Sequence, residues 1–432
     1  MVRVRGASYA QERRKSAEAM DEESRLTRRT FFGGAALTGI SVTLATPAVA
    51  SATVGRAERQ ARRAQRRARR AAKKAPKAPA ETLSRTVRGR AAFDDSGELK
   101  PFEFERRPMG DDDILIEIEY ASICHSDIHQ ERGDWGPQQY PQVPGHEIVG
   151  IVRAVGSKVT KFEVGDRAGV GCMVDSCMRC DACSHGEEHY CQQGKTLFTY
   201  GNPDAREPTG ITQGGYSTQI VVRDHFAVHI PDHIPLEEAA PLLCAGITTY
   251  SPIMQANFDV GAKVGVAGIG GLGHLAVKLA LAKGAEVYAF TTSPSKVKDI
   301  QAWGAKTVVV TGPKDLMPLR GELDWMISTI PVQYDVATYA SVVKPHGTFT
   351  QVGMPNRFEL TLSAIGLSMS RVKFDASLIG GIPETQEVVH FCADNDVRAD
   401  IQVISADEVT QAWVDVQNKK ARYRYVIDAS TF

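Results

Sequence analysis

Four cysteines stand close together in the pattern Cys177-x2-Cys180-x2-Cys183-x7-Cys191. Four thiolates at these intervals can close a tetrahedron around one Zn²⁺, and they leave no coordination position open for a substrate. A redox pair would need only one Cys-x-x-Cys spacing, and the two-residue gaps crowd the sulfurs of a disulfide pair. The spacing therefore predicts a structural zinc site on these four residues.

Further residues of metal-binding type are scattered along the chain. They are Cys124, His146, Glu147 and Cys244. A catalytic zinc needs three protein ligands and one position left for substrate or water. No local spacing shows that these residues meet, and a buried cysteine is more often inert core than a ligand. Their contexts, CHSD at 124–127 and GHEIVG at 145–150, make them candidates for a second, catalytic zinc site.

A glycine-rich motif, Gly268-Ile269-Gly270-Gly271-Leu272-Gly273, lies between a predicted strand and a predicted helix. A Gly-x-Gly-x-x-Gly run alone is a weak signal, but this one follows the β-rich residues 263–267 and opens the helical pattern of 273–283. The pyrophosphate of a dinucleotide requires that context, because its phosphates bind at the N-terminus of a helix. We therefore expect Gly268, Gly270, Gly271, Leu272 and Gly273 to bind a dinucleotide cofactor.

The end of the next predicted strand, 286–290, indicates which dinucleotide binds. A carboxylate at that point would bind the ribose diol of NAD and repel the 2′-phosphate of NADP. The strand is followed instead by hydroxyl side chains and a cation, on Thr291, Thr292, Ser293 and Lys296. Because these groups would bind a phosphate, the sequence predicts NADP(H).

Two kinds of domain position these motifs. Short β-rich segments separated by glycine and proline predict a β-barrel-like domain, at 114–120, 147–155, 168–170 and 216–222. After Cys244, strands alternate with helices. The expected strands are 263–267, 286–290, 307–310, 325–328 and 348–352, and the expected helices are 273–283 and 295–303. This alternation is typical of βαβ units, so the fold class is α/β with a doubly wound parallel sheet.

The composition excludes several classes of protein. The 432-residue chain is 43% hydrophobic and 24% charged. These fractions are typical of a globular protein, and they exclude a fully disordered chain. Residues 1–90 hold 22 Lys and Arg against 7 Asp and Glu, whereas residues 91–432 hold 29 against 44. An acidic body argues against nucleic acid as a partner, because phosphate contacts need clustered cations. With 8 cysteines, the chain is also too long and too poor in cysteine for a disulfide scaffold.

Residues 1–52 predict a twin-arginine export signal. Arg28 and Arg29 precede an apolar run at 31–50, and the small residues at 47–52 suit a signal peptidase. The alternatives are a membrane-spanning helix, which three glycines and several hydroxyl residues in the run weaken, and a wrongly assigned start codon.

Residues 53–90 predict a basic linker of Ala, Arg, Lys and Pro. Its stretch 56–77 is either a solvated, self-repelling spacer or a surface that adheres to anionic lipid. We expect an exported or membrane-associated protein that contacts the export machinery, with a cytoplasmic location as the alternative.

With its motifs in this order, the chain resembles the zinc-dependent medium-chain alcohol dehydrogenases, and among them the cinnamyl alcohol dehydrogenase-like aldehyde reductases. Residues 145–159 resemble the zinc signature of the family, and residues 240–250 resemble that subgroup. The resemblance implies a GroES-like catalytic domain that is split around an inserted Rossmann domain. The implied bounds are 91–241 and 379–432 for the catalytic domain, about 172–195 for its structural-zinc lobe, and 242–378 for the Rossmann domain.

The resemblance also implies roles for individual residues. Cys124, His146 and Cys244 would bind the catalytic zinc, with Glu147 as a neighbouring or exchanging ligand. Ser126 would touch the substrate oxygen, His129 would pass its proton to solvent, and Asp127 would orient His146. Further implied positions are Trp135 in the substrate pocket and Thr248, Val352 and Gly353 along the cofactor.

These expectations describe a homodimeric enzyme with two zinc ions per chain that reversibly reduces aldehydes to primary alcohols with NADPH. Zinc would polarise the aldehyde oxygen, and the nicotinamide would deliver hydride to the carbon. One alternative is a zinc-free quinone or enone reductase of the same superfamily, against which the intact ligand set argues. Another is a non-catalytic sensor or scaffold, which would bind NADP without turning over an aldehyde.

Overall fold

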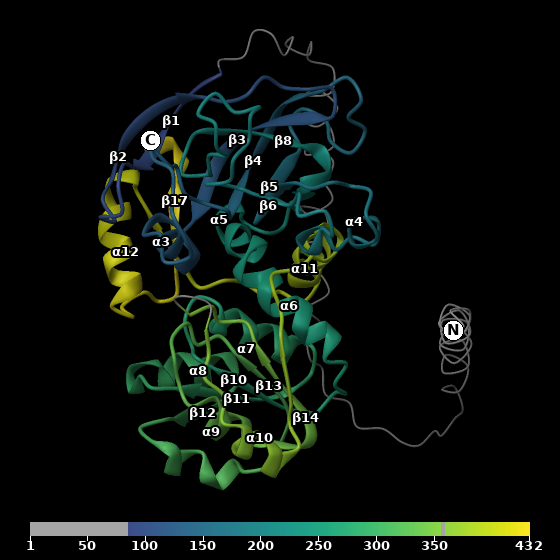
Figure 1. Cartoon of the computed structure of the whole chain (residues 1–432), viewed down its shortest axis with the longest axis vertical. Helices are drawn as coiled ribbons and strands as arrows, with labels where there is room; N and C mark the ends of the chain where they lie inside the picture. The colour runs from purple at the N-terminus through teal and green to yellow at the C-terminus, as the bar shows by residue number, and fades with distance from the viewer. Residues whose placement is uncertain (1–84, 356–358) are drawn as a thin grey trace, which may run out of the picture. The chain divides into compact units, whose positions relative to one another are not determined.

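The computed structural model describes residues 85–355 and 359–432. The predicted export signal, 1–52, and the linker as far as residue 84 lie outside these described residues. Within them, the chain forms two larger sheets and two small ones, and Figure 1 labels most of their strands. The predicted fold class is confirmed, because one larger sheet is parallel and doubly wound and the other is the mainly antiparallel sheet of a GroES-like domain.

The parallel sheet has six strands in the order β12-β11-β10-β13-β14-β15. Its strands are β10 (Lys263–Ala267), β11 (Glu286–Thr291), β12 (Lys306–Val309), β13 (Leu323–Ser328), β14 (Val343–Gln351) and β15 (Lys373–Ala376). The accompanying helices are α6 (Ala245–Gln255), α7 (Gly273–Ala282), α8 (Val297–Trp303), α9 (Val336–Ala340) and α10 (Ala364–Ser370). Numbered from β10, the strand order is 3-2-1-4-5-6, the arrangement of Rossmann domains. Such a sheet binds its ligand beyond the carboxyl ends of its central strands.

The second sheet has seven strands, in the order β16-β17-β3-β4-β5-β9 with β8 paired to β3. Its strands are β3 (Asp113–Ser122), β4 (Ile148–Val155), β5 (Arg167–Val170), β8 (Gln219–Arg223), β9 (Ala227–His229), β16 (Ile401–Ile404) and β17 (Arg424–Asp428). The helices of this part are α3 (His125–Glu131), α4 (Asp181–Ser184), α5 (Leu236–Ala239), α11 (Ile382–Asp394) and α12 (Val409–Gln417). The sheet therefore combines strands from before and after the Rossmann domain.

Two expected boundaries need correction. Strand β1 (Thr86–Ala92) pairs in register with β2 (Leu99–Glu105). Residues 86–90 therefore belong to the folded body and not to the linker, and the buried Val87 shows that this hairpin has a core face. The strand expected at 216–222 begins only at Gln219, where pairing with β3 starts; residues 216–218 bond instead to β1, through the N–H of Arg90 to the carbonyl of Tyr216 and the N–H of Thr218 to the carbonyl of Arg88.

The four-cysteine lobe is anchored to the point where the chain returns from the Rossmann domain. The lobe contains α4 and the short strands β6 (Met173–Asp175) and β7 (Leu197–Phe198). Its fully buried Glu188 accepts from the backbone N–H of Ile382 (3.0 Å), the first residue of α11, and lies 2.6 Å from Nε2 of His225. Burial favours a higher pKa for the Glu188 carboxyl, but these two donors outweigh it and hold the pKa below its usual value.

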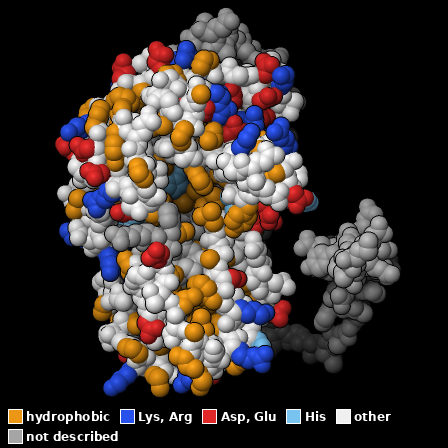
Figure 2. Space-filling model, in the orientation of Figure 1, with side chains coloured by type: hydrophobic (Ala, Val, Ile, Leu, Met, Phe, Trp, Pro, Cys, Tyr) orange, Lys and Arg blue, Asp and Glu red, His pale blue; other side chains and the backbone are white. Residues whose placement is uncertain are grey.

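Among the described residues, no helix combines the length and the apolar character that a bilayer crossing needs. On the face drawn in Figure 2, acidic and basic side chains are interspersed over the described part of the chain.

Candidate active site

Helix α3 presents three of the expected site residues in one short segment. Cys124 is the N-cap of this helix, and its backbone N–H donates to Oδ2 of Asp127 (2.9 Å). Ser126 follows in the first turn, with its Oγ 3.6 Å from Sγ of Cys124. His129 lies one turn further along, so that a hydroxyl and an imidazole occupy the same side of the helix beside the thiol.

The four scattered residues meet in the fold. Their ligand atoms all lie within 4.8 Å of one another, and all four residues are buried. They come from three separate segments: Cys124 caps α3, His146 and Glu147 precede β4, and Cys244 begins α6. The two sulfurs are 3.9 Å apart, which is the spacing of two thiolate ligands on one metal and not that of a disulfide.

Asp127 orients the imidazole of this group. Its fully buried carboxylate places Oδ1 2.9 Å from Nδ1 of His146, which leaves Nε2 of that ring for the cluster. The pKa of the Cys124 thiol lies well below its ordinary value, because Cys244 and His146 donate hydrogen bonds to its thiolate. The arrangement is therefore a thiolate-rich metal site with a histidine held in one orientation.

Glu147 is held by a partner that sequence reasoning missed. Its Oε2 accepts from Nη2 of Arg424, the first residue of β17, and that nitrogen also lies 3.2 Å from Oγ of Ser122. Burial raises the pKa of Glu147 to about 7, and the Arg424 charge opposes that rise. An arginine directly before the apolar residues 425–427 of strand β17 (RYVID) was the one signal in the sequence for this contact.

The four cysteines of the lobe also converge. Sγ of Cys177 and Sγ of Cys183 are 3.8 Å apart, and those of Cys180 and Cys191 are 4.0 Å apart. A tetrahedron with zinc–sulfur bonds of about 2.3 Å has edges of about 3.8 Å, so the sulfurs fit a four-thiolate zinc site. The pKa of Cys191 is about 6, because backbone N–H groups and Cys177 stabilise its thiolate against the cost of burial.

His129 is fixed by three neighbours. Its Nδ1 lies 2.6 Å from Oδ2 of Asp134, and its ring stacks on those of His125 (4.7 Å between centroids) and Trp135 (5.2 Å). Burial and the adjacent His129 lower the pKa of His125 to about 4, so this neighbour is uncharged near neutral pH. The structure thus places Trp135 in contact with His129 of α3. It also adds Asp134 to the expected site residues, as the partner of His129.

The glycine motif forms an open cradle after β10. A Cβ on Gly273 would stand 1.9 Å from the carbonyl oxygen of Gly268, and one on Gly271 would stand 2.7 Å from Nη1 of Arg424. A Cβ on Gly270 would meet no atom within 4 Å, so its backbone borders free space. Gly268 itself has a φ of +83°, which favours glycine. Arg424 thus contacts both the metal site and the loop expected to bind the pyrophosphate.

The remaining cofactor candidates lie on α6 and at the ends of β13 and β14. The backbone N–H groups of Val352 and Gly353 both donate to the carbonyl of Ser328, so the ends of β13 and β14 lie together. Thr248 stands one turn of α6 beyond Cys244, and its buried Oγ1 has no hydrogen-bond partner among the described residues. Nε2 of His129 and Oε1 of Glu147 are buried and unpaired in the same way. Unpaired buried polar atoms are rare in native proteins, so these three fit a site that holds additional groups.

The residues that follow β11 differ partly from expectation. Thr292 is exposed and Ser293 half-buried, but Thr291 is buried and its Oγ1 accepts from the N–H of Ser293 (3.1 Å). Lys296 is buried as well, and its Nζ donates to the carbonyl of Ile269 in the glycine loop (2.5 Å).

A further cation, Arg422, lies at this strand end and was missed from the sequence. Its Nη2 donates to Oγ of Ser295 (2.7 Å). Burial lowers the pKa of Lys296 to about 8, and the charges of Arg422 and Lys419 contribute to that shift. The strand end is therefore a group of cations and hydroxyls in which Lys296 is already bound to the protein backbone and Arg422 lies 3.6 Å from the carboxylate of Asp299.

Two protein families match successive parts of the chain. The family described as alcohol dehydrogenase GroES-like domain matches residues 110–232, which include Cys124, His146 and the four-cysteine lobe. The family described as zinc-binding dehydrogenase matches residues 271–394, which begin within the glycine motif.

Individual proteins are similar over nearly their whole lengths. NADP-dependent alcohol dehydrogenase C 1 of Mycolicibacterium smegmatis is 44% identical over 347 residues, which are 80% of this chain and 99% of that protein. Cinnamyl alcohol dehydrogenase 8 of Arabidopsis thaliana is 42% identical over 353 residues, 81% of this chain and 97% of the relative. A crystal structure of CAD from Helicobacter pylori complexed with NADP(H) is 41% identical with a TM-score of 0.76, and the match covers 81% and 99% of the two chains.

Replacing Arg424 by Met should destabilise the protein by about 3–5 kcal/mol, because Glu147 would remain as a buried carboxylate without its cation. Denaturant unfolding of the zinc-loaded protein measures the change in the free energy of unfolding. The matched control is the double variant Glu147→Gln/Arg424→Met, which buries no lone charge and should recover part of the loss. Equal stability of the single and double variants would contradict this view of the pair.

Proposed function

Because the chain belongs to the zinc-binding medium-chain alcohol dehydrogenase family, we propose that it interconverts aldehydes and primary alcohols with NADP(H), acting mainly as an aldehyde reductase. The observation that carries the proposal is the convergence of Cys124, His146 and Cys244 beside a glycine loop that shares Arg424 with them. Named relatives matched over nearly their whole lengths are dehydrogenases of alcohols, which supports the reaction class.

Each residue of the site has a defined task in this proposal. When bound, zinc supplies the Lewis acidity that polarises a carbonyl oxygen, and the nicotinamide supplies the hydride. Cys124, His146 and Cys244 hold the metal, and Arg424 holds the Glu147 carboxylate beside them. Oγ of Ser126, next to Cys124, donates the proton that the new alcohol oxygen needs.

The proton that Ser126 loses is replaced through its neighbour on α3. His129 lies one helical turn away, and its Nδ1 faces Asp134 at 2.6 Å, which leaves Nε2 as the atom able to carry a proton toward the site. The stacked rings of His125 and Trp135 keep that imidazole in place.

Aldehyde turnover by two cysteine variants tests the proposal together with the expected two zinc ions per chain. Cys124→Ser should abolish NADPH oxidation with aldehydes, keep the thermal midpoint within a few degrees of wild type, and lose one zinc per chain. Cys180→Ser should instead unfold the lobe first, because structural zinc supplies folding free energy. Metal analysis, a coupled absorbance assay and thermal unfolding give the three readouts.

The outcomes separate the alternatives. A zinc content of one or less in freshly purified wild type would contradict the two-site assignment. NADP(H) binding without turnover of any aldehyde would favour a sensor or scaffold, and turnover of enones or quinones that survives in Cys124→Ser would favour the zinc-free reductase.

We further propose that Lys296, Arg422 and the hydroxyls of Thr292 and Ser293 select NADPH over NADH through charge-assisted hydrogen bonds to the 2′-phosphate. Lys296→Glu should weaken NADPH binding at least tenfold more than NADH binding, which falls only through loss of the bond to the carbonyl of Ile269, whereas the exposed neighbour Lys298→Glu is the matched control. Since the pKa of Lys296 is about 8, its ammonium is charged below that pH and neutral above it. The preference for NADPH should therefore shrink as the pH rises through about 8. A wild type that prefers NADH would contradict this assignment.

The destination of the protein is a separate proposal. Arg28-Arg29 would direct export of the folded, metal-loaded chain, because thiolate ligands must be kept reduced until zinc is bound. Free NADPH is not expected outside the cytoplasm, so an exported enzyme would carry a tightly bound cofactor or would stay tethered to the membrane by an uncleaved signal. In either case the basic stretch 56–77 would lie near anionic lipid. Fractionation of cells that express wild type or the Arg28→Lys/Arg29→Lys variant tests this. Recovery of both proteins only from the soluble cytoplasm would overturn the proposal. The homodimer stays a prediction.

A further inference from the structure

Tyr216, which is not among the expected site residues, contacts the carboxylate of Asp127 that orients the ring of His146. Tyr216 is fully buried, and its hydroxyl donates to Oδ2 of Asp127 at 2.8 Å. We propose that Tyr216 is a positioning residue for the catalytic zinc, which acts by fixing the Asp127 carboxylate that in turn holds His146 and Cys124. The inference rests on the proposed zinc site but concerns a residue that the proposed reaction does not itself use.

Asp127 is the point through which Tyr216 would act. Oδ2 of Asp127 accepts from the backbone N–H of Cys124 (2.9 Å) and from the Tyr216 hydroxyl, while Oδ1 faces Nδ1 of His146 (2.9 Å). One carboxylate thus sets the direction of one ligand ring and the backbone of another ligand. The Tyr216 phenol is a donor that comes from outside the ligand segments, so it limits rotation of the Asp127 carboxylate about its own side chain.

The backbone around Tyr216 is also hydrogen-bonded to residues 144–145, which directly precede His146. The N–H of Tyr216 donates to the carbonyl of Pro144 (2.9 Å), and the N–H of Gly215 donates to that of Gly145 (2.9 Å). A Cβ on Gly145 would stand only 2.6 Å from Cδ1 of the Tyr216 ring, so the ring lies directly against this glycine. Position 216 therefore contacts the metal-site segment through both its backbone and its side chain.

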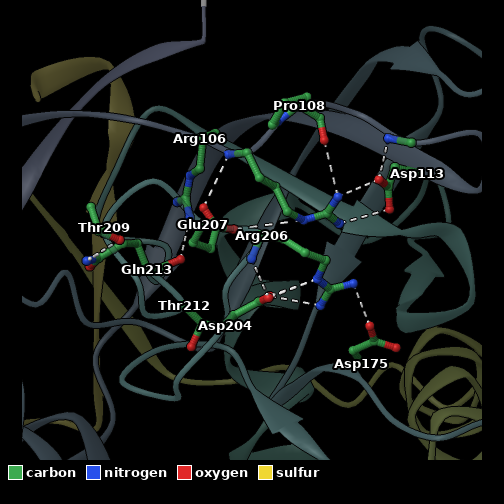
Figure 3. A network of polar contacts seen from close by, with 12 residues as sticks. Arg106, Pro108, Asp113, Asp175, Asp204, Arg206, Glu207, Thr209, Thr212 and Gln213 are labelled. Atoms are coloured by element: carbon green, nitrogen blue, oxygen red, sulfur yellow. Dashed lines mark hydrogen bonds and ion pairs between the residues drawn. The ribbon is translucent and has the colours of Figure 1, made fainter.

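A buried arginine holds the loop that carries Tyr216. The guanidinium of Arg106 donates to the carbonyl oxygens of Gln213, Gly214 (2.7 Å) and Gln219 (2.9 Å), which lie on both sides of the tyrosine. Figure 3 shows this side chain reaching Gln213 in a larger network of charged groups. Arg106 is only 2% exposed, and burial lowers its pKa to about 10, so it stays charged at neutral pH. These charge-assisted hydrogen bonds hold the backbone of residues 213–219 in place around Tyr216.

One other phenol lies close to the same groups and defines the scope of the inference. The ring of Tyr200 is 5.7 Å from that of His146, and burial together with an interaction with the Asp127 carboxylate raises the pKa of the Tyr200 hydroxyl well above its ordinary value. Tyr216 differs from it because Arg106 fixes its loop and because its backbone pairs with the chain next to the ligand. Removing the Tyr216 hydroxyl alone should therefore loosen the carboxylate without emptying the space that the ring fills.

The test measures zinc affinity of the full chain by competition with a chromophoric chelator. Partners that orient a metal-bound histidine change metal affinity by about 10- to 100-fold, so Tyr216→Phe should weaken the more labile zinc by about tenfold. Tyr140→Phe is the matched control, because that hydroxyl donates to the backbone carbonyl of Glu131 in the same domain and should leave the affinity unchanged. Circular dichroism confirms that each variant is folded.

A double-mutant cycle distinguishes positioning from general weakening. If Tyr216 acts through Asp127, Tyr216→Phe should cause no further loss of zinc affinity in an Asp127→Asn background. Unchanged affinity in Tyr216→Phe, or an equal loss in both backgrounds, would overturn the inference. If Tyr216→Phe does not fold, Arg106→Lys takes its place with the same expectations. A wild type without a chelatable zinc would instead contradict the proposed function, so the two failures are separable.

Discussion

The buried ion pair between Glu147 and Arg424 connects the metal site to the cofactor domain. Taking two charges out of water is costly, so such a pair persists only where both partners are held in good geometry. Glu147 precedes β4 in the catalytic sheet, and Arg424 opens β17, the strand with which the chain returns to that sheet. Because Arg424 also contacts the glycine loop at Gly271, the last strand of the protein must be in place before the site is complete.

The two candidate metal sites differ in how much of the fold they require. The lobe draws its four sulfurs from one local segment, residues 177–191. The second set comes from three segments and depends on α3, the start of β4 and the start of α6. Local sequence spacing cannot fix the positions of these ligands. Hydrogen bonds to Asp127 and Glu147 from buried side chains, such as Tyr216 and Arg424, fix them instead.

The cofactor side of the site shows how packing changes the meaning of a motif. Lys296 has the side chain expected of a phosphate ligand, yet it is buried and bound to the carbonyl of Ile269. Arg422, far away in the sequence, brings a second cation to Ser295 at the same strand end. Selection of the coenzyme would thus be shared between the Rossmann domain and the C-terminal segment. The neighbouring Arg424 of the same segment likewise contacts the glycine loop, at Gly271.

The sequence alone determined the features that depend on short separations. The closed four-cysteine lobe, the glycine motif between β10 and α7, and the lack of a carboxylate directly after β11 are all local patterns, because a few residues fix their geometry. Strand β10 has the predicted bounds, and the α/β class follows from the alternation of strands and helices.

Only the tertiary structure decided what meets across long separations. It brought Cys124, His146 and Cys244 together, paired Glu147 with Arg424, and placed Tyr216 on Asp127. It also showed that β1 begins at Thr86, where the sequence predicted linker, and that residues 214–216 bind the 143–145 segment before β8 starts. The reason is physical: a local pattern records which conformation a segment prefers, whereas contacts between distant segments depend on how buried charges and hydrogen-bonding groups find partners once the sheets have packed.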